Sequence, residues 1–169
     1  MKEVKYYVSD DGKQKSTNES DIIDYENRPY SSVEEMNEDL IAKWNSVVSN
    51  EDTVFCLGDF ALSDKDNIIE IGNRLNGHKV LIKGNHDHAS NITYQKAGFE
   101  KVVKETMIVK LPEWENPIRL SHHKDEINLG NYLNLYGHCH SKATDDDTHK
   151  CVCVELWNYT PILLEDLLK

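Results

Sequence analysis

Side chains that can bind metal ions follow several apolar segments of the sequence, at the point where each segment ends. The clusters combine aspartate, asparagine and histidine with small residues, and they are Ser9-Asp10, Gly58-Asp59, Gly84-Asn85-His86-Asp87, Ser121-His122-His123 and Gly137-His138-Cys139-His140. Carboxylate oxygen, amide oxygen and imidazole nitrogen suit divalent ions such as manganese, iron, nickel and zinc. Such ions can activate water and polarise a phosphoryl or carbonyl group. The residue types therefore predict a site for divalent metal ions.

These clusters can meet only if the segments before them are neighbouring strands. Residues 53–57 and 79–83 are short, apolar and rich in β-branched side chains, and each stops at a glycine-containing cluster. In α/β sheets, ligands bind just beyond the carboxyl ends of the strands. We expect further strands at residues 4–9, 99–103, 106–111, 118–121, 133–136 and 150–155.

Helical patterns separate the first of these strands. Ser32 and Glu35 have the spacing of a capping box, and apolar residues recur at helical spacing behind them to about Val48. Further helices are expected at residues 64–75, at 91–97 and after Pro161, whereas the polar stretch 10–29 is expected to be a loop and 145–147 a hairpin tip. Strands that alternate with helices predict βαβ units in a layered α/β fold.

Length and composition restrict the class of protein. The chain has 169 residues, of which 38% are hydrophobic and 29% charged, so we expect a single domain over residues 1–169. The net charge of −11 argues against duplex nucleic acid as a partner, because phosphate binding requires a basic face. We find no signal peptide and no apolar stretch of membrane-spanning length, so a cytoplasmic location with reduced cysteines is expected.

The ordered set of clusters resembles the calcineurin-like metallophosphoesterase superfamily, in its small bacterial and phage branch. The resemblance extends from Asp10 to His140, and the tetrad Gly84-Asn85-His86-Asp87 and the Gly-His-x-His at Gly137 are its most specific parts. It implies a four-layer α/β/β/α sandwich and a dinuclear metal-dependent phosphoesterase. Metal-activated hydroxide would hydrolyse a phosphodiester or a phosphomonoester, with the diester favoured.

The resemblance also implies a role for each residue. Asp59 would bridge the two metal ions. The second metal site would be completed by Asn85, His122 and His138, and the first by Asp10 and His140. Manganese is the favoured metal, with iron, nickel or zinc as alternatives.

His86 would donate a proton to the leaving oxygen, with Asp87 orienting its ring. His123 is expected to be a neighbour of the metal ligands and not a ligand. The expected partner is a small phosphate ester, with a nucleotide among the candidates, and not a membrane; a homo-oligomer is compatible with the sequence.

One departure from the superfamily pattern concerns the first motif, Asp-x-His. Here Asp10 is followed by Asp11 and Gly12, and none of the eight histidines precedes Gly77. We therefore expect the first metal ion to bind weakly. The alternative is a catalytically degenerate member that serves as a binding or scaffold protein.

A second alternative is a structural zinc site. The residues that could form it are Cys139, His140, His149, Cys151 and Cys153. The alternating pattern of Cys151 and Cys153 places both on one side of a strand, where small core residues are the simpler interpretation.

Overall fold

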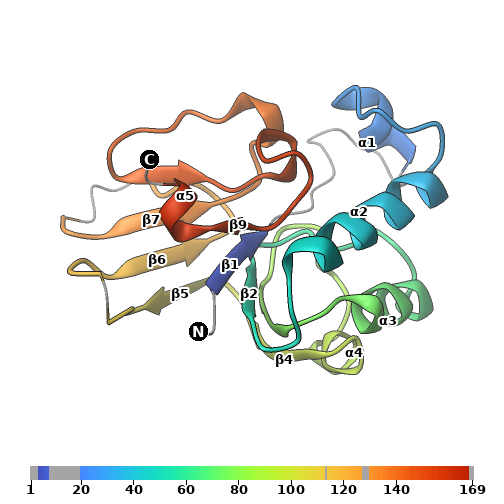
Figure 1. Cartoon of the computed structure of the whole chain (residues 1–169), viewed down its shortest axis with the longest axis horizontal. Helices are drawn as coiled ribbons and strands as arrows, with labels where there is room; N and C mark the ends of the chain where they lie inside the picture. Colours follow the sequence, from blue (N-terminus) through green and yellow to red (C-terminus); the bar gives the residue numbers. More distant parts are fainter. Residues whose placement is uncertain (1–3, 8–19, 113, 127–129, 168–169) are drawn as a thin grey trace.

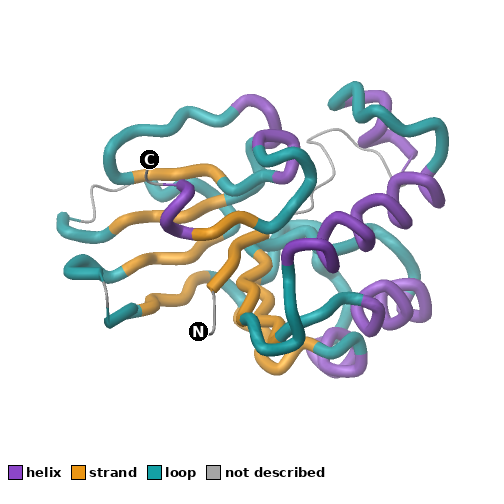
Figure 2. The backbone as a smooth tube through the Cα atoms, in the orientation of Figure 1, coloured by secondary structure: helices purple, strands orange, loops and turns teal. Residues whose placement is uncertain are grey.

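The computed structural model describes residues 4–7, 20–112, 114–126 and 130–167 and contains two β-sheets (Figures 1 and 2). The first sheet has the order β4-β3-β2-β1-β9 and the second the order β5-β6-β7-β8. The strands are β1 (Val4–Tyr7), β2 (Thr53–Cys56), β3 (His78–Ile82), β4 (Phe99–Val103), β5 (Thr106–Val109), β6 (Ile118–Ser121), β7 (Leu133–Tyr136), β8 (His149–Cys151) and β9 (Ile162–Leu163). Each predicted strand is present, although several are shorter than expected.

Strand direction confirms a mixed α/β fold. Strands β1 to β4 are parallel, and β9 joins β1 in the antiparallel direction. In the second sheet β5 and β6 are antiparallel, whereas β6, β7 and β8 are parallel. The parallel pairs β2–β3 and β6–β7 are the ones followed by the candidate metal ligands.

Two hydrophobic cores lie on the two faces of the first sheet. Helices α2 (Val33–Val47), α3 (Lys65–Arg74) and α4 (Asn91–Lys96) cover one face, and the second sheet faces the other (Figure 1). Strand β2 shows the division, because Val54 and Cys56 pack with the helices while Phe55 and the following Leu57 pack with the second sheet. A strand with both faces buried explains the continuous apolar run at this position.

The helix signals in the sequence are confirmed. The Ser32 hydroxyl caps α2 by accepting a hydrogen bond from the Glu35 N–H at 3.1 Å, and Asp64 caps α3 by accepting from Asp66 and Asn67. Gly98 follows α4 with φ +85°, a conformation that favours glycine at a helix end. A short helix α5 (Leu164–Leu167) follows Pro161 as expected.

Four details differ from the sequence prediction. Helix α1 (Ser20–Tyr25) forms within the expected loop, and β9 precedes α5. The last long strand ends early and gives way to a short 3₁₀ helix, η2 (Val154–Leu156). Residues 145–147 do not form a hairpin tip, because the strands on either side of them are parallel.

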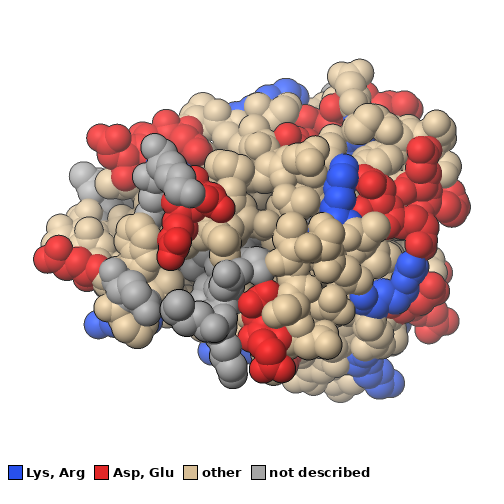
Figure 3. Space-filling model, viewed as in Figure 1, with Lys and Arg blue, Asp and Glu red and all other residues tan. Residues whose placement is uncertain are grey.

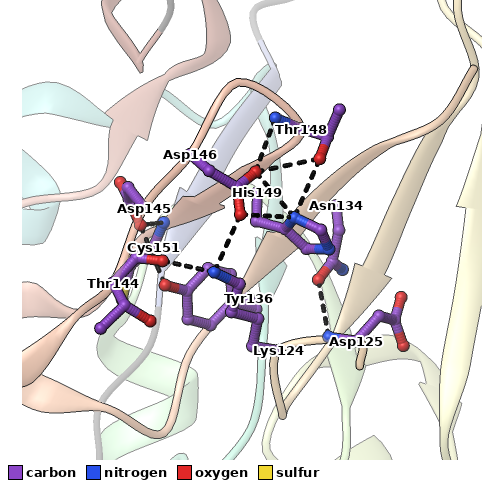
Figure 4. A network of polar contacts seen from close by, with 10 residues as sticks. All are labelled: Lys124, Asp125, Asn134, Tyr136, Thr144, Asp145, Asp146, Thr148, His149 and Cys151. Carbon is purple, nitrogen blue, oxygen red and sulfur yellow. Dashed lines mark hydrogen bonds and ion pairs between the residues drawn. The ribbon is translucent and has the colours of Figure 1, made fainter. Parts of the chain in front are cut away.

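The loop between β7 and β8 is instead held by its own aspartates (Figure 4). Asp145 accepts hydrogen bonds from the Tyr136 hydroxyl and the Cys151 N–H. Asp146 binds the His149 ring and the Lys124 ammonium group at 2.8 and 3.0 Å. These carboxylates therefore fix the path of the loop.

Within the described ranges, no helix has the length and apolar character needed to cross a membrane. Acidic side chains lie at both ends of the face shown in Figure 3, including the end where the helices lie.

Candidate metal centre

Four of the predicted metal ligands converge around one nitrogen atom. The Nε2 atom of His122 lies 2.8 Å from Asn85 Oδ1, 3.0 Å from His138 Nδ1 and 3.2 Å from Asp59 Oδ2. These residues follow β2, β3, β6 and β7, so both sheets contribute to the cluster. Asp59 and His122 are buried, whereas Asn85 is exposed, so the cluster opens to solvent on one side.

The tautomer of His122 makes this cluster suitable for a cation. Its Nδ1 atom lies 2.8 Å from the carbonyl oxygen of Leu57, which can only accept a hydrogen bond. In the neutral ring the proton therefore sits on Nδ1, and Nε2 carries a lone pair. That lone pair faces the oxygen atoms of Asp59 and Asn85, and a bound cation would turn this crowding of acceptors into coordination.

Three of the predicted metal ligands have an uncommon backbone conformation. Asp59, His138 and His140 adopt the left-handed region, with φ of +50°, +68° and +50°. Non-glycine residues rarely adopt this conformation, which costs about 1–3 kcal/mol and concentrates at functional sites. Three of the predicted ligands therefore share this conformation, which aspartate and histidine adopt more readily than most residues. Three residues outside the site, Asn27, Asn158 and Tyr159, also adopt it.

Two glycines allow the loops after β2 and β3 to approach closely. A Cβ atom on Gly58 would lie 2.3 Å from His122 Nδ1, and one on Gly84 would lie 2.1 Å from Asp59 Oδ1. Neither distance is compatible with a side chain. The glycines of the two motifs therefore let Asp59 and His122 reach the cluster.

Asp87 joins these two loops, and the prediction that it orients the His86 ring is wrong. Its carboxylate accepts hydrogen bonds from the backbone N–H groups of Asp59, Phe60 and Gly84 at 2.7 to 3.1 Å. It also accepts from the Tyr94 hydroxyl. Burial raises the pKa of Asp87, against the opposing effect of the backbone donors. Its role is to hold the strand ends together, which sequence could not reveal because its main partners are backbone groups.

His86 lies beside the cluster, in a position that fits its predicted role. Its backbone N–H donates to Asp59 Oδ1 at 2.7 Å, and its half-buried side chain lines a cavity of about 700 Å³. His88 lines the same cavity, with its ring centroid 6.2 Å from that of His86. A group in this cavity would contact His86, whose backbone binds Asp59 of the cluster.

His123 is closer to the cluster than sequence reasoning suggested. Its ring centroid lies 4.1 Å from that of His138 and 4.8 Å from that of His122. The ligand nitrogens of the three rings all lie within 4.8 Å of one another. The adjacent histidines His122 and His123 were the sequence signal for this position. In an extended chain, however, successive side chains point to opposite sides, which would place the His123 ring away from the cluster.

The residues expected at the first metal site are only partly described. Asp10, like Asp11 and Gly12, lies outside the described residues. His140 is buried, and its Nδ1 atom lies 3.1 Å from Glu155 Oε1. Burial would raise the pKa of Glu155, but the hydrogen bond from His140 and the charge of Arg28 outweigh it, so the pKa is lowered. Glu155 was not predicted as a functional residue.

The geometry does not support a structural zinc site among the cysteines. His140 binds Glu155 and His149 binds Asp146, while Cys151 and Cys153 belong to the core between the sheets. Contact with Cys151 and burial raise the pKa of Cys153 well above its ordinary value, which keeps it a thiol. Over the described part of the chain, the group of histidine, cysteine and acidic side chains that could hold a metal is His122, His123 and His138.

Comparison with known proteins gives two relatives of the whole chain, and no family model matches it. The structure of the protein of unknown function AQ665 from Aquifex aeolicus has a TM-score of 0.71 and 19% identity, over 98% of this chain and 97% of that one. It has the same fold. The uncharacterized protein MJ1445 of Methanocaldococcus jannaschii is 33% identical over 164 residues, which cover 90% of this chain and 84% of that protein. The chain therefore belongs to the family of MJ1445.

Proposed function

We propose that this protein is a dinuclear metal-dependent phosphoesterase of the calcineurin-like metallophosphoesterase superfamily. The observation that carries the proposal is the convergence of Asp59 Oδ2, Asn85 Oδ1 and His138 Nδ1 on the Nε2 atom of His122. Two facing sheets, with helices over the outer face of the first, supply three of the layers of the sandwich that the superfamily resemblance implies.

In this proposal the residues have the following roles. Asp59, Asn85, His122 and His138 would hold the second ion, and Asp59 would be shared with a first site that includes His140 and Asp10. The bound ions would supply an activated water and positive charge for the phosphate oxygens. His86 donates a proton to the leaving oxygen, because its side chain lines the cavity beside Asp59.

Two separate cavities, one lined by His86 and the other by Asn85, favour a diester over a monoester. His86 lines the cavity of about 700 Å³, whereas Asn85, His122 and His123 line a separate one of about 420 Å³. A phosphodiester has a substituent for each of these spaces, whereas a monoester fills only one. The smaller cavity is lined by three lysines and three acidic residues, Lys83, Lys104, Lys124, Glu105, Asp125 and Glu126, so its side chains offer both donors and acceptors to a polar substituent.

Hydrolysis of a small set of esters tests the proposal. Bis-p-nitrophenyl phosphate, p-nitrophenyl phosphate and 2′,3′-cyclic nucleotides are incubated with the protein and Mn²⁺, with Asp59→Asn and a chelator as controls. We expect diester hydrolysis that requires metal and Asp59. Metal binding without hydrolysis of any ester would contradict the proposal and favour a binding or scaffold role.

A further inference from the structure

Glu155 contacts His140, one of the two described residues proposed for the first metal site. Its Oε1 atom lies 3.1 Å from His140 Nδ1, and its side chain is only 6% exposed. The two residues come from consecutive short helices, η1 (His140–Lys142) and η2. The buried carboxylate of Glu155 therefore contacts Nδ1 of the His140 ring and does not occupy Nε2.

Arg28 fixes Glu155 in this position. Its Nε and Nη2 atoms donate to the same Oε1 atom at 3.1 and 2.5 Å, and its side chain is 2% exposed. Arg28 follows α1, more than a hundred residues before Glu155 in the chain. This ion pair joins the segment after α1 to η2. Removal of one partner from a buried ion pair is strongly destabilising.

The contact determines which nitrogen of His140 can bind a metal. A carboxylate only accepts hydrogen bonds, so in the neutral ring the proton sits on Nδ1 and Nε2 carries the lone pair. The Leu57 carbonyl selects the same tautomer of His122 through its Nδ1 atom. Partners of this kind fix the orientation of metal-binding histidines and typically change metal affinity by about 10- to 100-fold.

We propose that Glu155, held by Arg28, is a positioning residue that keeps His140 in the Nδ1–H tautomer and presents Nε2 to the first metal ion. The inference rests on the proposed function for the identity of the ion, but the tautomer itself does not depend on it. The first site lacks the histidine of the Asp-x-His motif. Orientation of His140 before metal arrives lowers the cost of binding there.

Two variants separate positioning from structural support. The double variant Arg28→Met/Glu155→Leu removes the acceptor without leaving a buried charge unpaired. Glu155→Gln retains an acceptor oxygen, because the two donors of Arg28 hold that oxygen at its present place. Asp146→Asn is the matched control, since Asp146 is the carboxylate that binds a different histidine, His149.

The first readout is nitrogen-detected NMR of the histidine rings in the metal-free full chain. We expect the Nδ1–H tautomer of His140 in the wild type, in Glu155→Gln and in Asp146→Asn, and the Nε2–H tautomer in the double variant. An Nε2–H tautomer in the wild type would overturn the inference. So would an unchanged tautomer in the double variant.

The second readout is Mn²⁺ titration by calorimetry. We expect the weaker of two sites to lose about 10- to 100-fold in affinity in the double variant. The stronger site should be unchanged, and Asp146→Asn should affect neither. Equal loss at both sites would indicate a structural role and overturn the inference. If the expected tautomer is found but no ester is hydrolysed, the positioning role of Glu155 stands and the phosphoesterase proposal fails.

Discussion

At the scale of the residue, the site depends on lone pairs that face one another. The Leu57 carbonyl places the lone pair of His122 Nε2 toward Asp59 and Asn85, and the backbone holds Asp59 and His138 in the left-handed region. A left-handed backbone costs free energy in a non-glycine residue, and clustered acceptor atoms are costly to bury unless a proton or a cation is bound among them. Binding of a cation offsets both costs.

His86→Ala tests the division between metal binding and proton donation. We expect kcat to fall by about 10²- to 10⁴-fold with metal content unchanged, because the side chain of His86 is proposed to donate a proton and not to coordinate. Metal content is measured by elemental analysis alongside the rate. His88→Ala, in the same cavity, is the control and should retain most activity. Loss of metal from His86→Ala would rule out this assignment.

Gly84→Ala tests the close approach of the two loops. The added methyl group would lie 2.1 Å from Asp59 Oδ1, so the carboxylate must move away from His122. We expect metal affinity to fall at least roughly tenfold, as for other changes that displace a ligand. Gly130→Ala is the control for backbone strain away from the site, because Gly130 has φ +67° and its added methyl group would meet no described atom within 4 Å. Equal affinities of both variants for Mn²⁺ would show that the contact is unimportant.

At the scale of the element, the site forms where the parallel strands β2 and β3 and the parallel strands β6 and β7 end. Asp87 connects the loops after β2 and β3 by accepting backbone hydrogen bonds from both. The sheets thereby bring together ligands that are separated by up to 79 residues between Asp59 and His138.

Asp87→Ala tests this connection. The change would leave three buried N–H groups and the Tyr94 hydroxyl without their acceptor, so we expect a loss of about 3–5 kcal/mol in the free energy of unfolding. Urea denaturation followed by circular dichroism measures it. Asp64→Ala, which removes the exposed N-cap of α3, should cost about 1 kcal/mol. A similar cost for both variants would mean that Asp87 does not hold the loops.

The sequence predicted the elements whose signals are local. Helix α2 has its capping residue and its periodic apolar face within its own residues, and β2 ends at its glycine. Helix α1 and strand β9 were missed because they depend on distant partners. The α1 residue Tyr25 contacts Lys142, and β9 has only two residues, which pair with β1 at the other end of the chain.

The candidate site was predictable to a similar extent. The side chains that converge on His122 were identified because their types and order are distinctive. The roles of Asp87 and Glu155 were not, since each depends on which groups the fold places opposite a carboxylate. A carboxylate that binds a metal and one that supports the surrounding structure are the same residue type in a sequence.

At the scale of the whole molecule, a metal centre would tie the two sheets together. Its ligands follow strands of both sheets, so a bound ion stabilises the folded state relative to an unfolded chain that lacks the site. At a metal concentration about 100-fold above Kd, the gain is about 2.7 kcal/mol. Calorimetry should therefore show a higher Tm in Mn²⁺ than in chelator, and a smaller rise for Asp59→Asn. An identical rise in both proteins would mean that the stabilising ion binds elsewhere.

The most direct test of the central claim is an anomalous difference map from crystals of the full chain soaked in Mn²⁺. The map locates the ion without reference to activity or stability. We predict a peak about 2.0–2.3 Å from Asp59 Oδ2, Asn85 Oδ1, His122 Nε2 and His138 Nδ1. A map with no peak at this cluster, or with the ion bound only by residues outside it, would contradict the account.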